Sequence, residues 1–332
     1  MVVNYGGIVL KILVTGAGGF IGSHLCEYLF QQGHKIRAFV RYNSRNHYGW
    51  LEESSYKKDI EFYTGDIRDF DSVKDSLKGI DVVFHLAALI GIPYSYVSPL
   101  AYIKTNVEGT YNVLQASREL GVKRIVHTST SEIYGSAQYV PIDEKHPVNP
   151  QSPYAATKSG ADELALSFYR SFDLPVSVIR PFNTFGPRQS ARAVIPTIIT
   201  QVLSGKKEVV LGNMESTRDM NYVQNTVQGF YEVGLHQDSI GEVVNLGSGR
   251  EVSVKDIALI IAKLCNVSLD FKLDENRIRP EKSEVERLLC DATKAKRIAG
   301  WVPKYSLEEG LSETIEWFKA HLHLFKPDVY NI

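Results

Sequence analysis

The sequence predicts an α/β fold, a doubly wound parallel sheet followed by a smaller mixed C-terminal region. Three observations support this prediction. Short apolar runs alternate with helical patterns over the first 180 residues, a glycine-rich turn joins the first run to the first helical segment, and the elements become shorter and more mixed after residue 180. Strands that alternate with helices form parallel sheets with helices on both faces.

The elements can be placed in order along the chain. Strand-like runs lie at 8–15, 35–40, 60–64, 82–86, 124–129 and 176–180, and helical patterns lie at 19–32, 70–78, 100–120 and 154–172. We expect residues 1–180 to form a dinucleotide-binding domain to which some later segments return. We expect residues 181–332 to form mainly a substrate-binding region over the carboxyl ends of the strands, where open parallel sheets bind ligands.

Composition narrows the possible partners. The 37 Lys and Arg residues balance the 38 Asp and Glu residues, so no overall field attracts nucleic acid or an anionic membrane. Cys26, Cys265 and Cys290 form no close pair, which argues against a disulfide framework or a metal site. No run reaches the roughly 18 apolar residues that span a bilayer. We therefore expect a cytoplasmic protein without a metal.

A glycine-rich turn, Thr15-Gly-Ala-Gly-Gly-Phe-Ile-Gly22, opens directly into the first helix. Glycine permits a tight turn and a close approach of backbone to pyrophosphate, and the helix N-terminus adds free N–H donors and partial positive charge. Strand, glycines and helix stand in the required order, which predicts dinucleotide binding. The predicted contacts are Gly16, Gly19, Phe20, Ile21 and Gly22.

The ends of the next strands predict the rest of the cofactor site. No carboxylate follows the second strand, whereas NAD sites usually carry one there to bond the ribose hydroxyls. The basic residues Arg41 and Arg45, with Ser44, favour the 2′-phosphate of NADP instead. Further cofactor contacts are expected from Asp66 and Ile67 after the third strand, near the adenine, and from Leu86, Ala87 and Ala88 after the fourth.

Tyr154 and Lys158 are spaced to share one face of a helix, with Ser152 suited to cap it and Pro153 to its first turn. A nearby ammonium favours the phenolate, so we expect Tyr154 to act as a base below its usual pKa of about 10. The segment Ser129-Thr-Ser-Glu132 lies about twenty residues upstream and carries a possible second catalytic group.

With these motifs in this order, the chain resembles the extended short-chain dehydrogenases/reductases, the NAD-dependent epimerases and dehydratases that modify nucleotide sugars. The resemblance implies a Rossmann domain, NAD(P), a nucleotide-diphosphate sugar and a homodimer formed by the helices at 100–120 and 154–172. It implies that Tyr154 takes a proton from a sugar hydroxyl as hydride leaves, that Lys158 holds the ribose and lowers the tyrosine pKa, and that Thr130 orients the hydroxyl. The implied substrate-binding residues are Asn183, Arg192, Arg218 and Arg279, and Asn106 is implied to be architectural.

Glu132 bears on which reaction follows. Epimerisation, 4,6-dehydration and uronate decarboxylation all begin with hydride removal at C4, but a dehydratase also needs a base at C5 and an acid at C6. The related dTDP-glucose 4,6-dehydratases carry Thr-Asp-Glu where this chain has Thr130-Ser131-Glu132. Glu132 can still deprotonate C5, while Ser131 leaves the C6 acid unassigned. The Thr-Ser-Glu version also occurs in UDP-glucuronate decarboxylases.

Longer segments at 42–51, 137–144 and 189–196 resemble the bacterial UDP-N-acetylglucosamine 4,6-dehydratases of legionaminic-type amino-sugar pathways. This resemblance implies conversion of UDP-GlcNAc to a UDP-4-keto-6-deoxy-hexosamine. A UDP-glucuronate decarboxylase, a 4-epimerase and a catalytically idle nucleotide-sensing scaffold stay open as alternatives. The residues also leave open NAD versus NADP, the nucleotide base and the configuration at C5.

Overall fold

Seven parallel strands form the central sheet in the order β10-β6-β5-β4-β1-β2-β3, which confirms the predicted fold class. The computed structural model describes residues 8–329, so residues 1–7 of the predicted first domain and residues 330–332 lie outside it. The strands are β1 (Lys11–Thr15), β2 (Lys35–Arg41), β3 (Glu61–Gly65), β4 (Val82–His85), β5 (Arg124–Thr128), β6 (Val176–Pro181) and β10 (Val243–Leu246). The direction of winding reverses between β1 and β4, and parallel sheets bind ligands at such a point.

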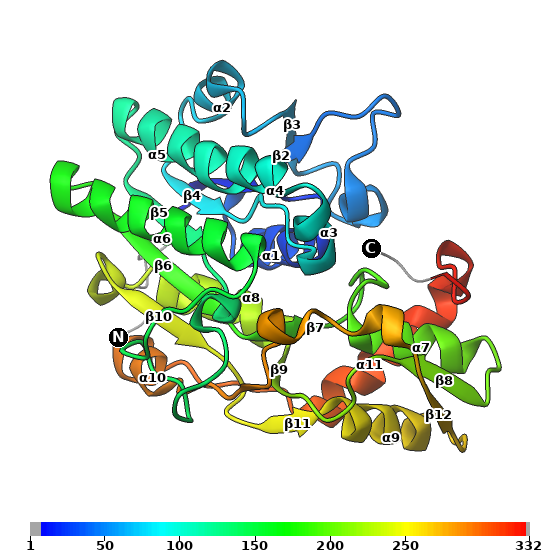
Figure 1. The fold of residues 1–332 in the computed structure, drawn as a ribbon. Coiled ribbons are helices and arrows are strands. Elements are labelled where there is room, and N and C mark those ends of the chain that lie inside the picture. The colour runs from blue at the N-terminus through cyan, green and yellow to red at the C-terminus, as the bar shows by residue number, and fades with distance from the viewer. Residues whose placement is uncertain (1–7, 330–332) are drawn as a thin grey trace.

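Helices cover both faces of the sheet (Figure 1). One face carries α2 (Phe70–Ser76), α5 (Gly109–Glu119) and α6 (Pro153–Phe172), while the other carries α1 (Phe20–Gln31), α8 (Val223–Gly234) and α10 (Thr293–Ala299). The central strands are buried on both sides: all four residues of β4 and all six of β6 are buried, whereas the edge strand β3 is mostly not. Such strands read as continuous apolar runs in the sequence.

The helix predicted at 100–120 is divided in three. It begins as α4 (Pro99–Tyr102), continues as the π-helix η2 (Ile103–Glu108) and becomes α5. Asn106 lies in the π segment, where its side chain accepts from Leu89 N at 2.9 Å and donates to Leu89 O at 3.0 Å. The wider turn of the π-helix thus occurs where Asn106 is hydrogen-bonded to the loop after β4. These contacts agree with the architectural role expected for Asn106. π-Turns of this kind often lie at functional sites.

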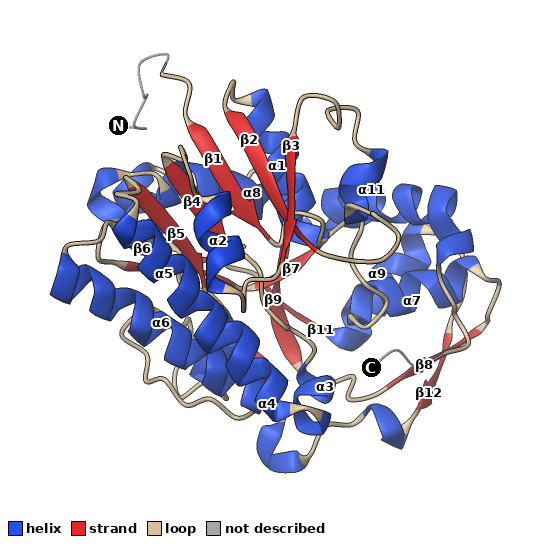
Figure 2. Ribbon diagram, turned by 90° about the horizontal axis from the view of Figure 1, so that it is seen from above, coloured by secondary structure: helices blue, strands red, loops and turns tan. Residues whose placement is uncertain are grey.

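Most of the remaining elements form a region over the carboxyl ends of the strands (Figure 2). The short turn at 237–239 is an exception and lies at the amino ends, where Ser239 contacts Arg124 and Ser177. A four-stranded sheet contains β7 (Asn183–Phe185), β9 (Thr217–Tyr222), β11 (Glu251–Ser253) and β13 (Arg287–Leu288), and β8 (Glu208–Leu211) pairs with β12 (Asp270–Leu273). The helices here are α7 (Val194–Leu203), α9 (Val254–Leu264) and α11 (Leu307–His321), and short turns are α3 (Ile92–Val97), η1 (Gly49–Glu53), η3 (Ser131–Tyr134), η4 (Gln237–Ser239), η5 (Glu275–Arg277), η6 (Glu281–Ser283) and η7 (Leu322–Leu324).

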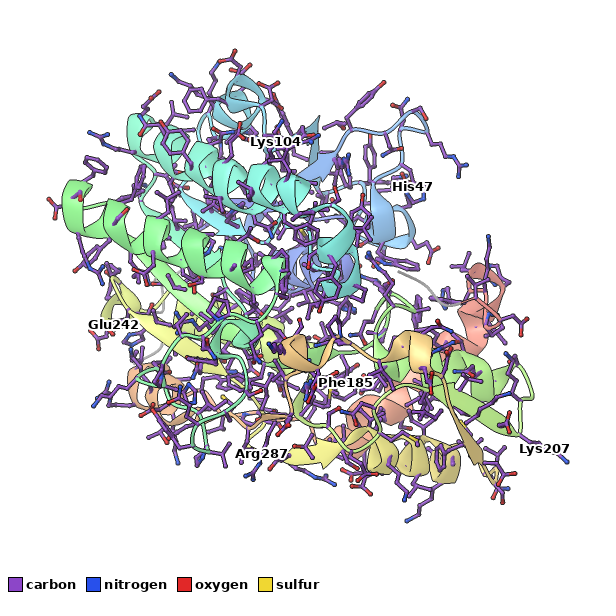
Figure 3. The ribbon with its side chains drawn as sticks, viewed as in Figure 1. His47, Lys104, Phe185, Lys207, Glu242 and Arg287 are labelled. Carbon is purple, nitrogen blue, oxygen red and sulfur yellow. The ribbon has the colours of Figure 1, made fainter. Side chains whose placement is uncertain are left out.

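Phe185 on β7 lies inside the molecule between this region and the large sheet, whereas Lys207, Glu242 and Arg287 lie at its outside (Figure 3). Phe185 is 1% exposed and packs its ring near that of Tyr222. The apolar core therefore continues from the sheet into the C-terminal region. Among residues 8–329, no helix combines the length and the apolar character needed to cross a membrane.

Candidate active site

The glycine turn between β1 and α1 leaves room only for backbone. Gly16 has a φ of +70°, and a Cβ added there would lie 2.9 Å from the backbone nitrogen of Ala87. A Cβ at Gly22 would lie 2.2 Å from Gly16 O. Gly19 begins α1 without a side-chain cap, and the first turn, which includes Phe20 and Ile21, carries no acidic residue. Free amides and the helix dipole there fit the pyrophosphate of a dinucleotide.

The other predicted cofactor residues lie at neighbouring strand ends. Arg41 and Ser44 are exposed at and after the end of β2. Asp66 accepts hydrogen bonds from the Arg68 side chain, which lowers the pKa of the Asp66 carboxyl group. Ile67 is buried, and its backbone carbonyl accepts a hydrogen bond from Asn112 Nδ2 at 2.9 Å.

Thr15 ties the end of β1 to the loop after β4. Its Oγ1 accepts from the backbone N–H groups of Leu86 and Ala87, both at 3.1 Å, and contacts His85 Nδ1 at 2.8 Å. Leu86, Ala87 and Ala88 are half-buried beside the glycine turn. The structure thus brings the predicted cofactor residues of β1, α1 and β4 together at the point where the sheet changes direction.

Tyr154 and Lys158 lie one turn apart near the start of α6, where Ser152 Oγ accepts from Ala155 N at 3.1 Å as an N-cap. Both side chains are buried, with Tyr154 8% and Lys158 5% exposed. A side-chain hydrogen bond joins Thr130 to the Tyr154 phenol. Lys158 Nζ donates to the backbone carbonyl of Thr128 at the end of β5.

The expectation that Lys158 holds the pKa of Tyr154 below 10 is wrong for the protein alone. Burial raises the pKa of the phenol, and the charge of Glu132 raises it further, while the hydrogen bond from Thr130 lowers it. Burial also lowers the pKa of Lys158, to about 8. Desolvation is the largest cause of the pKa shift at both groups, because a charge in the interior loses its hydration.

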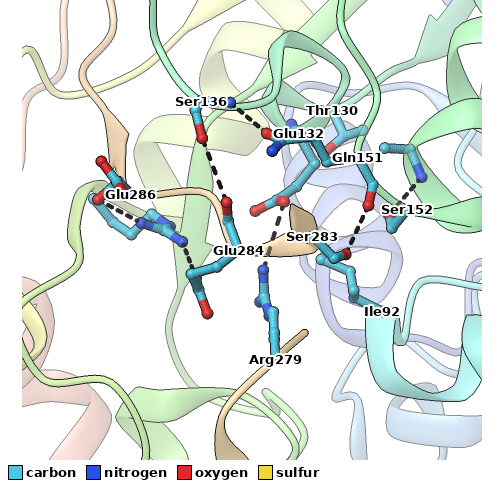
Figure 4. A network of polar contacts seen from close by, with 12 residues as sticks. Ile92, Thr130, Glu132, Ser136, Gln151, Ser152, Arg279, Ser283, Glu284 and Glu286 are labelled. Atoms are coloured by element: carbon cyan, nitrogen blue, oxygen red, sulfur yellow. Dashed lines mark hydrogen bonds and ion pairs between the residues drawn. The ribbon is translucent and has the colours of Figure 1, made fainter. Parts of the chain in front are cut away.

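Glu132 lies in η3, the short turn that follows β5. Thr130 caps this turn through its Oγ1, which accepts from Glu132 N at 3.3 Å, and both Ser131 and Glu132 are buried. Glu132 Oε2 lies 3.8 Å from Arg279 Nη1, as Figure 4 shows. The turn therefore places a carboxylate beside Thr130 and Tyr154, where it can exchange protons with a bound substrate.

A strap formed by residues 279–284 crosses this part of the site (Figure 4). Ser283 Oγ donates to Gln151 O at 2.6 Å, just before α6, and Glu284 O accepts from Ser136 Oγ at 3.3 Å. Arg279, at the start of the strap, is partly exposed, and its Nη1 has no hydrogen-bond partner. A guanidinium in this state is suited to bind an anion.

Arg218 lies on β9 beside the same strap. Its Nη1 donates to Thr217 O at 2.9 Å, and its Nη2 lies 3.4 Å from Glu284 Oε1. The charges of Glu132 and Arg279 both act on Arg218, so these three side chains share one electrostatic environment. The structure thus unites Arg218 and Arg279 with the Thr130, Glu132 and Tyr154 group.

Asn183 and Arg192 lie further along the site. The Oδ1 of Asn183 on β7 is buried without a hydrogen-bond partner. Arg192 is exposed, and its Nη1 would lie 3.4 Å from a Cβ at Gly91, in the loop after β4. Tyr102, which donates to Gly91 O, packs edge-on against Tyr154 with ring centroids 6.3 Å apart. Arg192 is therefore connected to Tyr154 through that loop and not through the strap.

Sequence reasoning missed a buried polar cluster behind Lys158. Its members are His127 on β5, Ser129 after it, Asp162 on α6 and Arg180 on β6. The spacing of Tyr154, Lys158 and Asp162 at intervals of four was a signal that could have found Asp162. Within residues 8–329, no group of three or more His, Cys, Asp or Glu side chains is arranged to hold a metal ion.

The parallel sheet has a glycine turn at its switch point, with Thr130 after β5 and Tyr154 and Lys158 at the start of α6. This arrangement is that of a dehydrogenase of the short-chain type. The family model for GDP-mannose 4,6-dehydratase matches residues 13–314. The chain belongs to this family of NAD-dependent nucleotide-sugar dehydratases and epimerases.

Its relatives carry out more than one of the family's reactions. The chain is 32% identical to a UDP-glucuronate 4-epimerase of Thermodesulfobacterium geofontis, over 95% of this chain and 98% of that protein. It is 32% identical, over 93% of its length, to an Arabidopsis thaliana trifunctional UDP-glucose 4,6-dehydratase, 3,5-epimerase and reductase, of which it spans 47%. The solved dTDP-glucose 4,6-dehydratase DesIV of Streptomyces venezuelae, with NAD and TYD bound, matches with a TM-score of 0.85 and 29% identity over 96% of this chain and 99% of that one.

Proposed function

We propose that this protein is a 4,6-dehydratase that converts UDP-GlcNAc to a UDP-4-keto-6-deoxy-hexosamine. The observation that carries the proposal is the buried Glu132 carboxylate beside Thr130 and Tyr154. A 4-epimerase needs no carboxylate at that place, because its ketone only turns over and is reduced again. A dehydratase needs a group there that moves the C5 proton.

The bound dinucleotide supplies a reversible hydride acceptor at C4. Tyr154 takes the proton of the C4 hydroxyl, which Thr130 orients, and a 4-keto sugar results. The ketone makes the C5 proton acidic, and Glu132 removes it. The C6 hydroxyl group is protonated and leaves as water, which gives a C5–C6 double bond. The hydride that left C4 is returned to C6 and a solvent proton adds at C5, so the net change is the loss of one water.

Two residues, Ser131 and Glu132, are candidates for the acid that protonates the C6 hydroxyl group. Ser131 stands where related dehydratases have an aspartate, and a serine hydroxyl is a weak acid. Glu132, once it carries the C5 proton, can deliver that same proton to the leaving hydroxyl if both groups depart from one face of the sugar. We therefore propose a syn elimination in which one carboxylate acts first as base and then as acid.

Arginines on two segments support a diphosphate site. Arg218 and Arg279 lie beside Glu132, on β9 and on the strap, and Nη1 of Arg279 makes no hydrogen bond and only a 3.8 Å ion pair with Glu132. We propose that both bind the substrate diphosphate, with Asn183 beside it and Arg192 at the edge near Gly91. The segment 89–95 is a loop only as far as Gly91, because α3 begins at Ile92. It lies between Arg192 and Tyr154 and is the proposed place for the acetamido group of the sugar.

The main experiment incubates the purified protein with UDP-GlcNAc and no added reductant, and follows mass. Loss of one water supports dehydration, and in deuterated water the product should carry one deuterium at C5. An unchanged mass with a C4-inverted sugar would overturn the proposal in favour of epimerisation. Parallel reactions with UDP-glucose, dTDP-glucose and GDP-linked sugars identify the nucleotide and the sugar, and loss of carbon dioxide from UDP-glucuronate would indicate a decarboxylase.

Epimerisation is the second candidate, and one comparison favours it. The Thermodesulfobacterium epimerase matches this chain along almost its full length, and Thr130, Tyr154 and Lys158 suffice for its reaction. The scaffold alternative predicts that the protein keeps its cofactor without turning over any of these sugars.

Two finer proposals concern the cofactor and the assembly. Exposed Arg41 and Ser44 after β2 support NADP, while the related DesIV structure holds NAD. Mass analysis of the dinucleotide released by denaturation decides between them.

We also propose a homodimer through α5 and α6, which lie side by side and expose Tyr111 and Phe172, each 44% exposed. Light scattering at micromolar concentration should give twice the chain mass.

A further inference from the structure

Asp162 lies one turn beyond Lys158 on α6 and is 1% exposed. Its Oδ2 accepts from Ser129 Oγ at 2.5 Å and from Nε and Nη2 of Arg180 at 3.2 and 3.1 Å. Its Oδ1 lies 3.2 Å from His127 Nε2. Two strands and a loop thus hold this carboxylate in one orientation, on the same helix face as Lys158.

His127 adds a donor to the cluster without adding charge. Its Nδ1 is buried without a hydrogen-bond partner, and its Nε2 faces a carboxylate that only accepts. The ring therefore carries its proton on Nε2. Burial lowers the pKa of His127, and the charge of Lys158 lowers it further, so the ring is neutral near pH 7.

Charged and titratable groups surround Lys158 on several of the elements packed near it. Burial also lowers the pKa of His85, the histidine on β4, well below its ordinary value. Two cations and one carboxylate then remain buried behind Tyr154. The charged and titratable groups are Asp162 on α6 itself, His85 on β4, His127 on β5, Arg180 on β6 and, beside Tyr154, Glu132 on η3.

We propose that Asp162 is a positioning residue whose negative charge keeps the buried Lys158 protonated, so that the ammonium stays available beside Tyr154. The need for it follows from burial, because an ammonium removed from water tends to lose its proton unless a carboxylate offsets that cost. Asp162 also balances Arg180, which would otherwise add to the positive charge. When Tyr154 ionises, the cluster of Lys158, Arg180, Asp162 and phenolate becomes neutral.

This inference rests on the roles proposed for Tyr154 and Lys158, which dehydration and epimerisation share. Asp162→Asn keeps the shape of the side chain and removes its charge. Because a neighbouring anion favours the ammonium, its loss should move the alkaline limb of the pH profile of kcat down by about one pH unit. KM for the nucleotide sugar should stay within about twofold, since Asp162 lies behind the catalytic pair.

Asp219→Asn is the matched control. Asp219 is also fully buried and accepts from Ser248 N at 2.7 Å and Gly249 N at 2.8 Å, but it belongs to the β9 sheet. It should lower the unfolding midpoint without moving the alkaline limb. Equal shifts in the two variants would show a general effect of buried-carboxylate loss and would overturn the proposal.

Two further variants separate charge from folding, since Asp162→Asn leaves Arg180 buried without a carboxylate. Asp162→Glu keeps the charge and should keep the alkaline limb near its original pH. The double variant Asp162→Asn/Arg180→Met should recover stability, and it serves as the test if the single variant does not fold. Its alkaline limb should lie between that of Asp162→Asn and that of the unaltered protein, because loss of the Arg180 charge partly offsets loss of the Asp162 charge. A limb at or above that of the unaltered protein would refute the proposal. Inactivity of the unaltered protein on every nucleotide sugar would instead refute the proposed function.

Discussion

Glu132 Oε2 lies 3.8 Å from Arg279 Nη1, so the proposed C5 base contacts the strap that carries a proposed diphosphate ligand. The two residues lie in different regions of the fold, one after β5 and one between η5 and η6. The proposed proton transfer and the proposed diphosphate binding would therefore meet at one ion pair.

Glu132→Gln should stop dehydration without stopping the first oxidation. The amide keeps the size of the side chain but accepts no proton from C5, so we expect product formation to fall by at least about 10²-fold. Reduced nicotinamide should still appear by absorbance when substrate is added. Glu281→Gln, an exposed carboxylate on the strap, is the control and should act at the normal rate. Normal turnover by Glu132→Gln would mean that another group moves the C5 proton.

Arg279→Gln should weaken substrate binding. Loss of a charge-assisted contact to a diphosphate costs about 1.5–3 kcal/mol, which corresponds to a rise in KM of roughly 10- to 150-fold. Lys282→Gln changes an exposed cation three residues away and should leave KM within about twofold. Calorimetric titration with UDP measures the affinity of each variant for the diphosphate group without catalytic turnover. Equal UDP affinity in the two variants would remove Arg279 from the diphosphate site.

Lys158→Met should abolish activity yet stabilise the fold near neutral pH. The pKa of Lys158 falls from 10.5 to about 8 on folding, so between these values the unfolded chain binds more protons and the unaltered protein gains stability as the pH rises. Below about pH 8 the full cost of burying the ammonium is present. We expect the free energy of unfolding of the variant to be higher by about 1–3 kcal/mol at pH 7, and the difference to shrink towards pH 10.

Lys123→Met provides the comparison for that measurement. Lys123 is exposed and pairs with Asp81 at 2.8 Å, so its replacement should change stability little, because solvent screens an exposed ion pair. Urea unfolding at pH 7 and pH 10 measures both variants. A less stable Lys158→Met protein at pH 7 would show that burial of this ammonium carries no net cost.

Gly16→Ala should destroy dinucleotide binding, whereas Gly33→Ala should not. Both glycines have positive φ, +70° and +88°, so alanine is strained at each by about 1 kcal/mol. Only at Gly16 does the new Cβ meet backbone, at 2.9 Å from Ala87 N, while nothing lies within 4 Å at Gly33. Quenching of protein fluorescence by added dinucleotide measures the affinity of each variant. Intact binding by Gly16→Ala would place the pyrophosphate elsewhere.

The π segment shows where prediction from sequence stopped in the fold. The apolar pattern at 100–120 correctly indicated a helix, but the side chain of Asn106 bonds Leu89 N and O from a different loop. Such a contact depends on the packing of two segments distant in sequence, and no local pattern records it. Strand order has the same origin, since pairing such as that of β6 with β10 depends on where the chain returns.

The sequence by itself determined the features that depend on near neighbours: the alternation of strands and helices, the glycine turn before α1, and the shared helix face of Tyr154 and Lys158. Only the tertiary structure decided how these groups are charged and what surrounds them. It buried Tyr154 and raised its pKa, brought Arg279 to Glu132 and set Asp162 behind Lys158. The physical reason is that desolvation and ion pairing depend on distance in space and on exclusion of water, which separation along the chain does not measure.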